Sequence, residues 1–262
     1  NDMGSASVEE LQAILDTLPA DEIVHAFGYG SGVVAQGNAE ASGLLLTDVI
    51  VVVKSTQRFH ERNMLLNPSH YVVRNSYFVN FWQKYRDYDP GVYFVVTESF
   101  KYGVVAYDDL VGDLQKWKYL YIAGRMHKPV VDIVTNQAIE KLQTTFNLQY
   151  ALAAALLLHK SSSSPSHEIY KTIASLSYLG DFRMRFAEDP DKIRKLVYSN
   201  LEAWDELYQA PTKRLMDQGL LHIQSDDQWQ WDSSGFLRKD LLPLRATTSL
   251  RTVLAQRVAR SA

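Results

Sequence analysis

The sequence has no cysteine among its 262 residues, no long hydrophobic run and no strong excess of charge of either sign. The absence of cysteine excludes disulfides, thiolate zinc sites and a cysteine nucleophile. The longest apolar stretch, 150–158, is far shorter than the roughly 20 residues that a membrane-spanning helix requires. A formal net charge of −3 gives no general affinity for polyanions, so we expect no nucleic-acid partner.

Strand-like and helical patterns alternate through the first half of the chain. Hydrophobic patterning predicts strands at five places: 23–29, 44–53, 92–97, 101–107 and 130–134. The third and fourth runs have the separation of a hairpin. Helical patterns at 69–85 and 108–117 lie between them. Because strands and helices are interleaved, the fold class is α+β (or α/β), with a first domain over 7–135.

The second half is richer in helices. Helices are predicted at 138–160, 167–178 and 191–208, with a flexible serine-rich link at 161–166 and a small hairpin over 220–231. This order predicts a helical, winged-helix-like domain at 136–234. The tail, 235–262, has six basic residues and a single aspartate, a composition that favours binding to an anionic membrane surface. A solvated basic tail is the alternative.

A glycine-rich turn, Phe27–Gly32, closes the first strand, and Asp48 lies inside the second, strongly apolar strand. Such a turn exposes backbone N–H groups and the hydroxyl of Ser31, which suit a triphosphate. A carboxylate in an apolar strand is costly unless it has a partner, and Mg²⁺ is one that it commonly holds against phosphates. The pair predicts a polymerase-β-like nucleotidyltransferase domain, whereas the glycines alone fit an ordinary tight turn.

The second carboxylate of that motif is absent. It is normally found two residues after the first, where this chain has Ile50. Two-metal chemistry needs several carboxylates, so another group completes the site or the domain only binds nucleotide. Asp109, Asp113 and Asp181 are candidates, and the sequence does not choose between them.

Further motifs follow in a fixed order along the chain. They are Tyr29–Val33, Asp48, 59–64, 67–71, 91–93, 101–105, Asp113, Trp117, 123–130 and 176–183. Together they resemble the mitochondrial-type phosphatidate cytidylyltransferases, the translocator assembly and maintenance family. The resemblance covers roughly 27–197, and a hydrophobic residue two places after the aspartate is also this family's pattern.

The resemblance implies a nucleotidyltransferase domain, a winged-helix-like domain and a Mg²⁺-dependent reaction. In that reaction CTP and phosphatidic acid give CDP-diacylglycerol and pyrophosphate. Asp48 is then the metal ligand and, with Lys101, a catalytic residue. The implied nucleotide-binding residues are Tyr29, Gly30, Ser31, Gly32, Lys101, Arg125 and Lys128. The implied contacts to nucleotide or lipid phosphate are His60, Asn63, Asn67, His70, Asp181 and Arg183.

Other interpretations remain open at this point. Taken alone, Lys101 fits a solvated lysine, and His60 and His70 fit surface or capping residues. The domain itself fits a nucleotidyltransferase acting on RNA or protein, or a catalytically silent nucleotide-binding regulator. For a lipid enzyme we expect a peripheral membrane location, on the cytoplasmic face in a bacterium or the matrix side of the mitochondrial inner membrane in a eukaryote.

Overall fold

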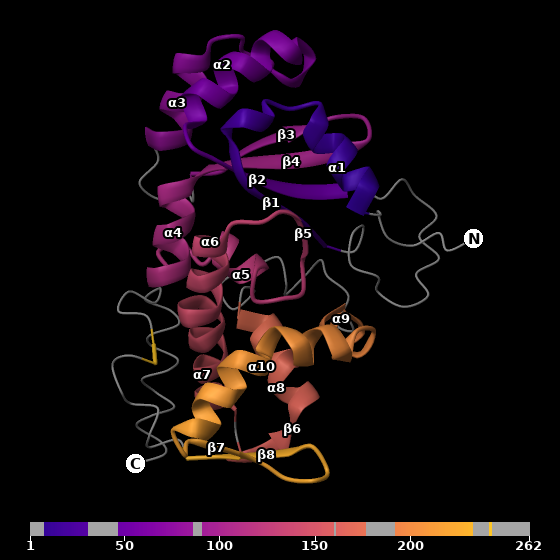
Figure 1. Cartoon of the computed structure of the whole chain (residues 1–262), viewed down its shortest axis with the longest axis vertical. Coiled ribbons are helices and arrows are strands. Elements are labelled where there is room, and N and C mark those ends of the chain that lie inside the picture. The colour runs from indigo at the N-terminus through magenta and orange to yellow at the C-terminus, as the bar shows by residue number, and fades with distance from the viewer. Residues whose placement is uncertain are drawn as a thin grey trace, which may run out of the picture. The chain divides into compact units, whose positions relative to one another are not determined.

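The computed structural model describes residues 8–30, 47–85, 91–159, 161–176, 192–232 and 241–242. The chain forms two compact units (Figure 1). The first is Asn1–Gly112 with Val130–Glu140, and the second is Asp113–Pro129 with Lys141–Ala262. The elements confirm the α+β class. The domain ranges 7–135, 136–234 and 235–262 stay predictions.

A mixed five-stranded sheet is the centre of the first unit. Its strands are β1 (Ile23–Tyr29), β2 (Thr47–Val53), β3 (Tyr93–Val96), β4 (Phe100–Ala106) and β5 (Val131–Val134). Their order across the sheet is β3-β4-β2-β1-β5. The β2–β4 pair is parallel and the other three pairs are antiparallel. The expected hairpin is confirmed as β3–β4, and the other predicted strands are confirmed within a few residues.

The two faces of this sheet differ in character, because successive side chains of a strand point to opposite sides. One face carries Val49, Val51 and Val53 and packs beneath α1 (Val8–Asp16) and α2 (Thr56–Leu66). A short 3₁₀ turn, Ala20–Glu22, connects α1 to β1. The other face carries the side chains that alternate with this core, among them Asp48 and Lys101. The predicted site therefore lies on the face of the sheet that α1 and α2 do not cover.

The helix expected over 69–85 is wrong as a single element. A 3₁₀ turn, Pro68–His70, is followed by five non-helical residues, 71–75, and α3 begins only at Ser76 and runs to Tyr85. Tyr71 has extended backbone angles and is buried. Its hydroxyl contacts the buried side chains of His60 and Asn63 in α2, and helical geometry at 71 would remove the tyrosine from them.

The second unit combines helices with a small sheet. Its α-helices are α5 (Ile122–Arg125), α7 (Leu148–Leu158), α8 (Ser166–Leu176), α9 (Lys192–Tyr198) and α10 (Leu201–Asp217). Helices α4 (Tyr107–Lys116) and α6 (Gln137–Leu142) each carry the chain from the first unit into the second. A π-helical turn, Gln143–Asn147, joins α6 to α7. Strands β6 (Ser163–Pro165), β7 (Leu221–Ile223) and β8 (Gln228–Trp231) pair in the order β6-β8-β7.

Two predictions for this unit need correction, and one is confirmed. The flexible link at 161–166 is wrong, because β6 pairs with β8 there and Ser166 bonds to Asp227, its Oγ 2.6 Å from Oδ2. The single helix at 191–208 is wrong, since α9 ends at Tyr198 and α10 continues to Asp217 with a buried proline inside it. The predicted hairpin at 220–231 is confirmed as β7–β8.

Candidate functional site

Three neighbouring strands bring Tyr29, Asp48 and Lys101 into one row. Asp48 pairs in register with Tyr29 on one side and with Lys101 on the other. The Lys101 Nζ lies 3.8 Å from Asp48 Oδ1. The two side chains are 36% and 33% exposed, so solvent and a ligand can reach both. The structure thus joins the two residues that the resemblance names as catalytic.

Gly30 completes this row at the point where β1 ends. Its φ of +84° is a left-handed conformation that glycine adopts without strain. A Cβ built on Gly30 would lie 3.7 Å from Asp48 Oδ2, so the backbone of the turn passes directly beside the carboxylate. Ser31 and Gly32 lie outside the described residues, and their phosphate contacts stay a prediction.

Lys101 is oriented by an aromatic ring that needs a glycine beneath it. The Nζ of Lys101 lies 4.7 Å from the ring centroid of Phe94, a cation–π distance. Phe94 pairs with Gly103, where an added Cβ would lie only 2.8 Å from the ring. Gly103 had no predicted role, although an isolated glycine inside a strand is a known signal of close approach.

The face that carries Asp48 has a second carboxylate, which sequence analysis missed. Ile50, two residues after Asp48, is fully buried and pairs with Phe27, which on its other side pairs with Asp132 of β5. Asp132 lies between valine and isoleucine, the same signal that identified Asp48. Two strand spacings of about 4.8 Å separate the two aspartates laterally, so they do not share a single ion.

Burial changes the protonation of the groups around Asp132. Desolvation, with the charge of Glu140, raises the pKa of the Asp132 carboxyl. The His25 Nε2 lies 3.7 Å from Asp132 Oδ1, but burial lowers the pKa of His25 to about 4. His25 is therefore neutral near pH 7 and forms no ion pair with Asp132 there.

Asp109 and Asp113 do not complete the site at Asp48. Asp109 follows β4, beyond the end of that strand opposite Lys101. The buried Asp113 accepts backbone N–H bonds from five residues: Tyr119, Leu120, Tyr121, Ile122 and Ala123. These bonds stabilise a loop in which Trp117 and Leu120 adopt positive φ, so the Asp113 carboxylate has a structural role. Asp181 and Arg183 lie outside the described residues.

Arg125 and Lys128 belong to the second unit. The Arg125 guanidinium carbon lies 3.9 Å from the ring centroid of Tyr121, and its Nη1 donates to the Tyr121 carbonyl. The backbone around these cations is held by side chains. Asn147 donates to the Ala123 carbonyl and Tyr208 donates to the His127 carbonyl. Segment 123–128 is thus an ordered support for two cations.

Four of the six residues implied for nucleotide or lipid phosphate contacts lie in the described part of the chain, and they form a network on the other face of the sheet. His60 contacts Tyr71 and Gln83. The Asn63 and His70 side chains contact the Tyr102 hydroxyl, and Asn67 donates to Asn63. Because Tyr102 follows Lys101 in β4, it points away from Asp48.

This network is neutral and partly buried, with Asn67 and His70 half-buried. His60 and Asn63 are fully buried, which rules out the surface interpretation of His60. Burial lowers the pKa of His60 to about 4 and also lowers the pKa of His70. The structure does not bring these residues together with Asp48, and their ligand contacts stay predictions. Their observed effect is to join α2 to α3 and β4.

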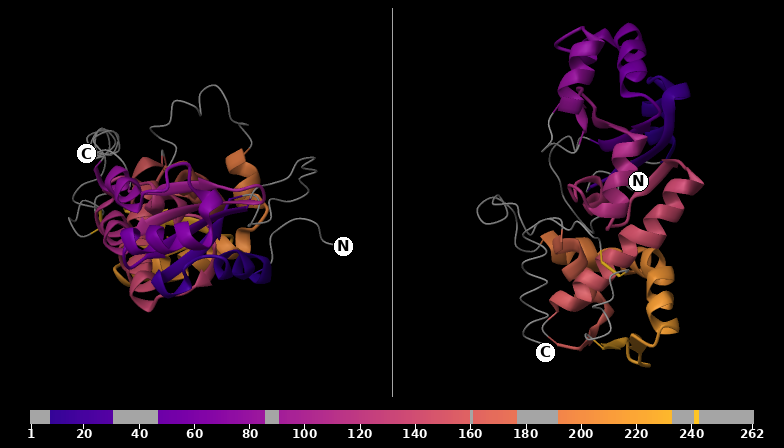
Figure 2. Two further views of the ribbon diagram at one scale, coloured as in Figure 1. Left: turned by 90° about the horizontal axis from the view of Figure 1, so that it is seen from above. Right: turned by 90° about the vertical axis from the view of Figure 1, so that its left-hand side faces the viewer.

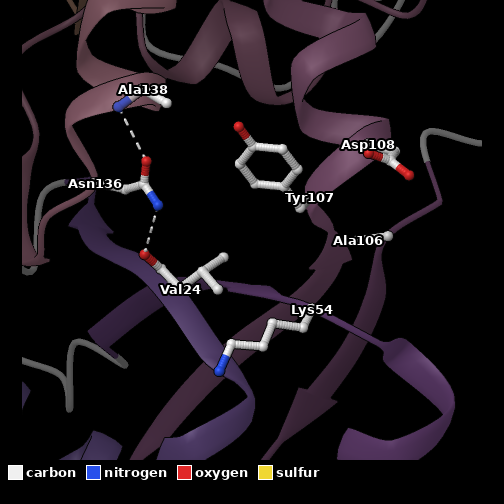
Figure 3. A pocket seen from close by; sticks show the side chains of 7 residues that line it. All are labelled: Val24, Lys54, Ala106, Tyr107, Asp108, Asn136 and Ala138. Carbon is white, nitrogen blue, oxygen red and sulfur yellow. Dashed lines mark hydrogen bonds between the residues drawn. The ribbon is translucent and has the colours of Figure 1, made fainter.

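A pocket of about 380 Å³ opens at the other end of the sheet (Figure 3). Seven residues line it: Val24, Lys54, Ala106, Tyr107, Asp108, Asn136 and Ala138. Lys54 donates to the Asp21 carbonyl, and Asn136 accepts from Ala138 N. None of the predicted site residues lines this pocket.

The described residues contain no group of three or more His, Asp or Glu side chains placed to hold a metal ion. No helix formed by these residues is long and apolar enough to cross a membrane.

Comparison with known proteins places the chain in a family. Residues 11–258 match the family described as phosphatidate cytidylyltransferase, mitochondrial. Proteins of that name from Caenorhabditis elegans, Xenopus laevis and Saccharomyces cerevisiae are 33%, 37% and 34% identical. The alignments cover 90%, 77% and 72% of this chain, and 75%, 62% and 52% of the relatives. This chain belongs to the mitochondrial phosphatidate cytidylyltransferase family.

Proposed function

We propose that this protein is a phosphatidate cytidylyltransferase, which converts CTP and phosphatidic acid to CDP-diacylglycerol and pyrophosphate. One observation carries the proposal: in a member of this family, a glycine turn, a carboxylate and a lysine meet in one row across β1, β2 and β4. Such a row presents backbone N–H groups, a metal ligand and a cation to a bound triphosphate.

The fold supports the finer domain assignment that the proposal needs. In the first unit, a strand ending in glycine lies beside a strand bearing an aspartate, as in polymerase-β-like nucleotidyltransferases. In the second unit, α8 and α10 adjoin a three-stranded sheet that includes the β7–β8 hairpin, as in winged-helix domains.

The residues present fit one Mg²⁺ ion that arrives with the nucleotide. Mg²⁺ is usually held by one or two carboxylates together with substrate phosphates, and Asp48 supplies one. With Lys101 only 3.8 Å away, the pair has no net charge and attracts a free cation weakly. Asp48 would therefore hold the ion only when triphosphate oxygens complete its coordination, and the ion would neutralise phosphate charge.

The proposed reaction depends on positioning the substrates and stabilising phosphate charge, and it needs no general base. A phosphate oxygen of phosphatidic acid attacks the α-phosphorus of CTP, and the bond to pyrophosphate breaks. The nucleophile is already an anion, so no side chain has to remove a proton. Lys101 stabilises the charge on the phosphates and Gly30 lets the backbone approach them, while nucleotide binding by Arg125 and Lys128 stays a prediction.

We place the enzyme at the surface of a mitochondrial membrane. Its proposed lipid substrate lies in a bilayer, and the relatives carry the word mitochondrial in their names. An anionic surface is the expected partner, because phosphatidic acid is itself anionic.

A catalytically silent nucleotide-binding protein is the second candidate. Ile50 favours it, because a buried isoleucine occupies the usual place of the second carboxylate. Incubation of the purified protein with CTP, Mg²⁺ and phosphatidic acid separates the two candidates. We expect CDP-diacylglycerol and pyrophosphate in equal amounts.

The matched pair of variants is Asp48→Asn and Asp16→Asn. Asp16 is an exposed residue of α1 whose carboxylate accepts from Gln12, away from the row. Asp48→Asn should abolish turnover and Asp16→Asn should not. CTP binding without any product in the parent protein would establish the silent interpretation.

A further inference from the structure

Exposed hydrophobic side chains are concentrated in one segment of the described chain. Eight lie between residues 65 and 82, whereas the other five are scattered. The eight are Leu65, Leu66, Val72, Val73, Tyr77, Phe78, Phe81 and Trp82. Tyr77 is 70% exposed and Val72 is completely exposed. Scattered apolar residues are normal on a surface, but a concentration of this kind marks an interaction site.

Four of these residues form one face of α3, which we call the aromatic face: Tyr77, Phe78, Phe81 and Trp82. Their spacing places them on adjacent turns of a single helical stripe. Phe78 and Trp82 are in edge-to-face contact, with centroids 5.8 Å apart. Helices α2 and α3 lie side by side at one end of the first unit (Figure 1 and Figure 2, right).

The opposite side of α3 is anchored, so the aromatic face is held outward. Val79 and Gln83 are buried. Gln83 Nε2 donates to the carbonyls of Gly91 and Val104, and Asn80 accepts from Thr56 of α2. Turning the aromatic face inward would break these bonds. The exposure is therefore a property of the folded unit.

The charge of the same segment is of one sign. Residues 63–85 contain no aspartate or glutamate, although the chain as a whole has a net charge of −3. The exposed Arg74 precedes α3 and the exposed Lys84 lies in its last turn. Protein segments that lie at the boundary between lipid headgroups and acyl chains typically combine aromatic residues with arginine and lysine.

We propose that the aromatic face of α3 inserts into the headgroup region of a bilayer containing anionic lipid. This inference rests on the proposed function, because it identifies how the protein reaches a substrate that lies in a bilayer. Phe78 and Phe81 supply apolar area, Tyr77 and Trp82 lie at the polar boundary, and Arg74 and Lys84 contact anionic headgroups.

Trp82 is a built-in reporter of this insertion. It is 45% exposed, whereas the other four tryptophans, Trp117, Trp204, Trp229 and Trp231, are at most 6% exposed. The test adds vesicles of phosphatidylcholine alone or mixed with phosphatidylglycerol to the full chain without CTP. Phosphatidylglycerol provides negative charge without being the proposed substrate. We expect a blue shift of emission with the mixed vesicles, quenching by phosphatidylcholine brominated on its acyl chains, and neither effect in Trp82→Phe.

A matched pair of double variants tests the apolar contribution. Phe78→Ser/Phe81→Ser alters the aromatic face, and Met216→Ser/Ile223→Ser alters two exposed apolar residues of the second unit. Phe78 and Phe81 are 45% and 52% exposed, so together they offer about one full phenylalanine to the bilayer. The first variant should partition into vesicles roughly tenfold less and the second should not change. Both should keep the parent's circular dichroism and melting temperature.

Activity distinguishes this inference from the proposed function. With a short-chain phosphatidic acid dissolved as monomers, Phe78→Ser/Phe81→Ser should equal the parent, while turnover on vesicles falls. If the parent produces no CDP-diacylglycerol from either substrate but Trp82 still inserts, the proposed function fails and the surface stands. If the protein binds vesicles while Trp82 emission stays unchanged, the inference is overturned. It is also overturned if Trp82 shifts with protein concentration alone and sedimentation shows a dimer.

Discussion

Replacement of Gly103 by alanine tests whether the candidate site depends on the close contact under Phe94. An added Cβ would lie 2.8 Å from the Phe94 ring, 2.8 Å from Val92 Cγ1 and 3.0 Å from Ile50 Cδ1. Ile50 is fully buried in the middle of β2 and has no room to move, so the strain falls on Phe94 and Val92. Phe94 is the ring that orients Lys101, and the strain therefore reaches the site.

The magnitude follows from two opposing effects. Overpacking a filled site costs about 1–3 kcal/mol. Replacing a strand glycine by alanine recovers roughly 0.5–1 kcal/mol of backbone entropy. We expect Gly103→Ala to lower the free energy of unfolding by about 1–2 kcal/mol, and to lower kcat/KM for CTP because Phe94 no longer holds Lys101 in place. Urea denaturation followed by circular dichroism measures the first effect, and initial rates of pyrophosphate release measure the second.

Gly112→Ala is the matched control. Gly112 lies in α4, and nothing is within 4 Å of a Cβ built there. The same chemical change should therefore raise stability there by up to about 1 kcal/mol, through helix propensity alone. If Gly103→Ala is as stable and as active as Gly112→Ala, the close packing of Phe94 on Gly103 does not exist as described.

Three further predictions concern Lys101, the buried histidines and Asp113. Lys101→Met should cost on the order of 2–4 kcal/mol of transition-state stabilisation, the scale of one preorganised charge contact, and a loss of kcat/KM below tenfold would make Lys101 an ordinary surface residue. The pKa values of His25 and His60 are about 4 in the folded protein against 6.5 for an unperturbed histidine, so the unfolded chain binds more protons in this range. The free energy of unfolding should therefore be greatest above pH 6.5, where both histidines are neutral in the folded and unfolded states, and should fall as the pH is lowered toward 4. Urea titrations at several pH values measure this, and an unchanged free energy of unfolding between pH 7 and 5 would contradict it. Asp113→Asn should destabilise the protein by about 2–4 kcal/mol, because an amide cannot accept all of the five backbone N–H bonds; a drop in the thermal unfolding midpoint is the readout, and a loss below about 1 kcal/mol would show that the loop does not depend on the carboxylate.

Local patterns in the sequence predicted much of the fold. The continuous apolar run in β2 and the hairpin spacing of β3 and β4 depend on neighbouring residues, and both predictions are confirmed. The errors occurred where a distant partner decides the local structure. Residues 163–165 look like a polar link and become a strand because β8 pairs with them. The helix expected from 69 is interrupted because Tyr71 bonds to α2.

The residues of the candidate site show the same difference between what local sequence predicts and what a distant partner decides. Asp48 could be recognised from the sequence, because an ionisable group in an apolar strand is an anomaly that needs no structure to detect, whereas Lys101 was identified only through the family resemblance. Gly103 and Asp132 each carried a signal in the sequence, but their cross-strand partners could not be predicted, because pairing depends on which residue the neighbouring strand places opposite.

By itself, the sequence determined the α+β class, the family motifs and the residue types available for phosphate chemistry, since these are properties of composition and order. Only the tertiary structure decided which of those residues share a face. The pairing of β2 with β4 unites Asp48 with Lys101, while the alternation of side chains sends Tyr102, and with it His60 and Asn63, to the other side. The physical reason is that strand register is set by long-range hydrogen bonds, and a shift of one residue exchanges the two faces of a sheet.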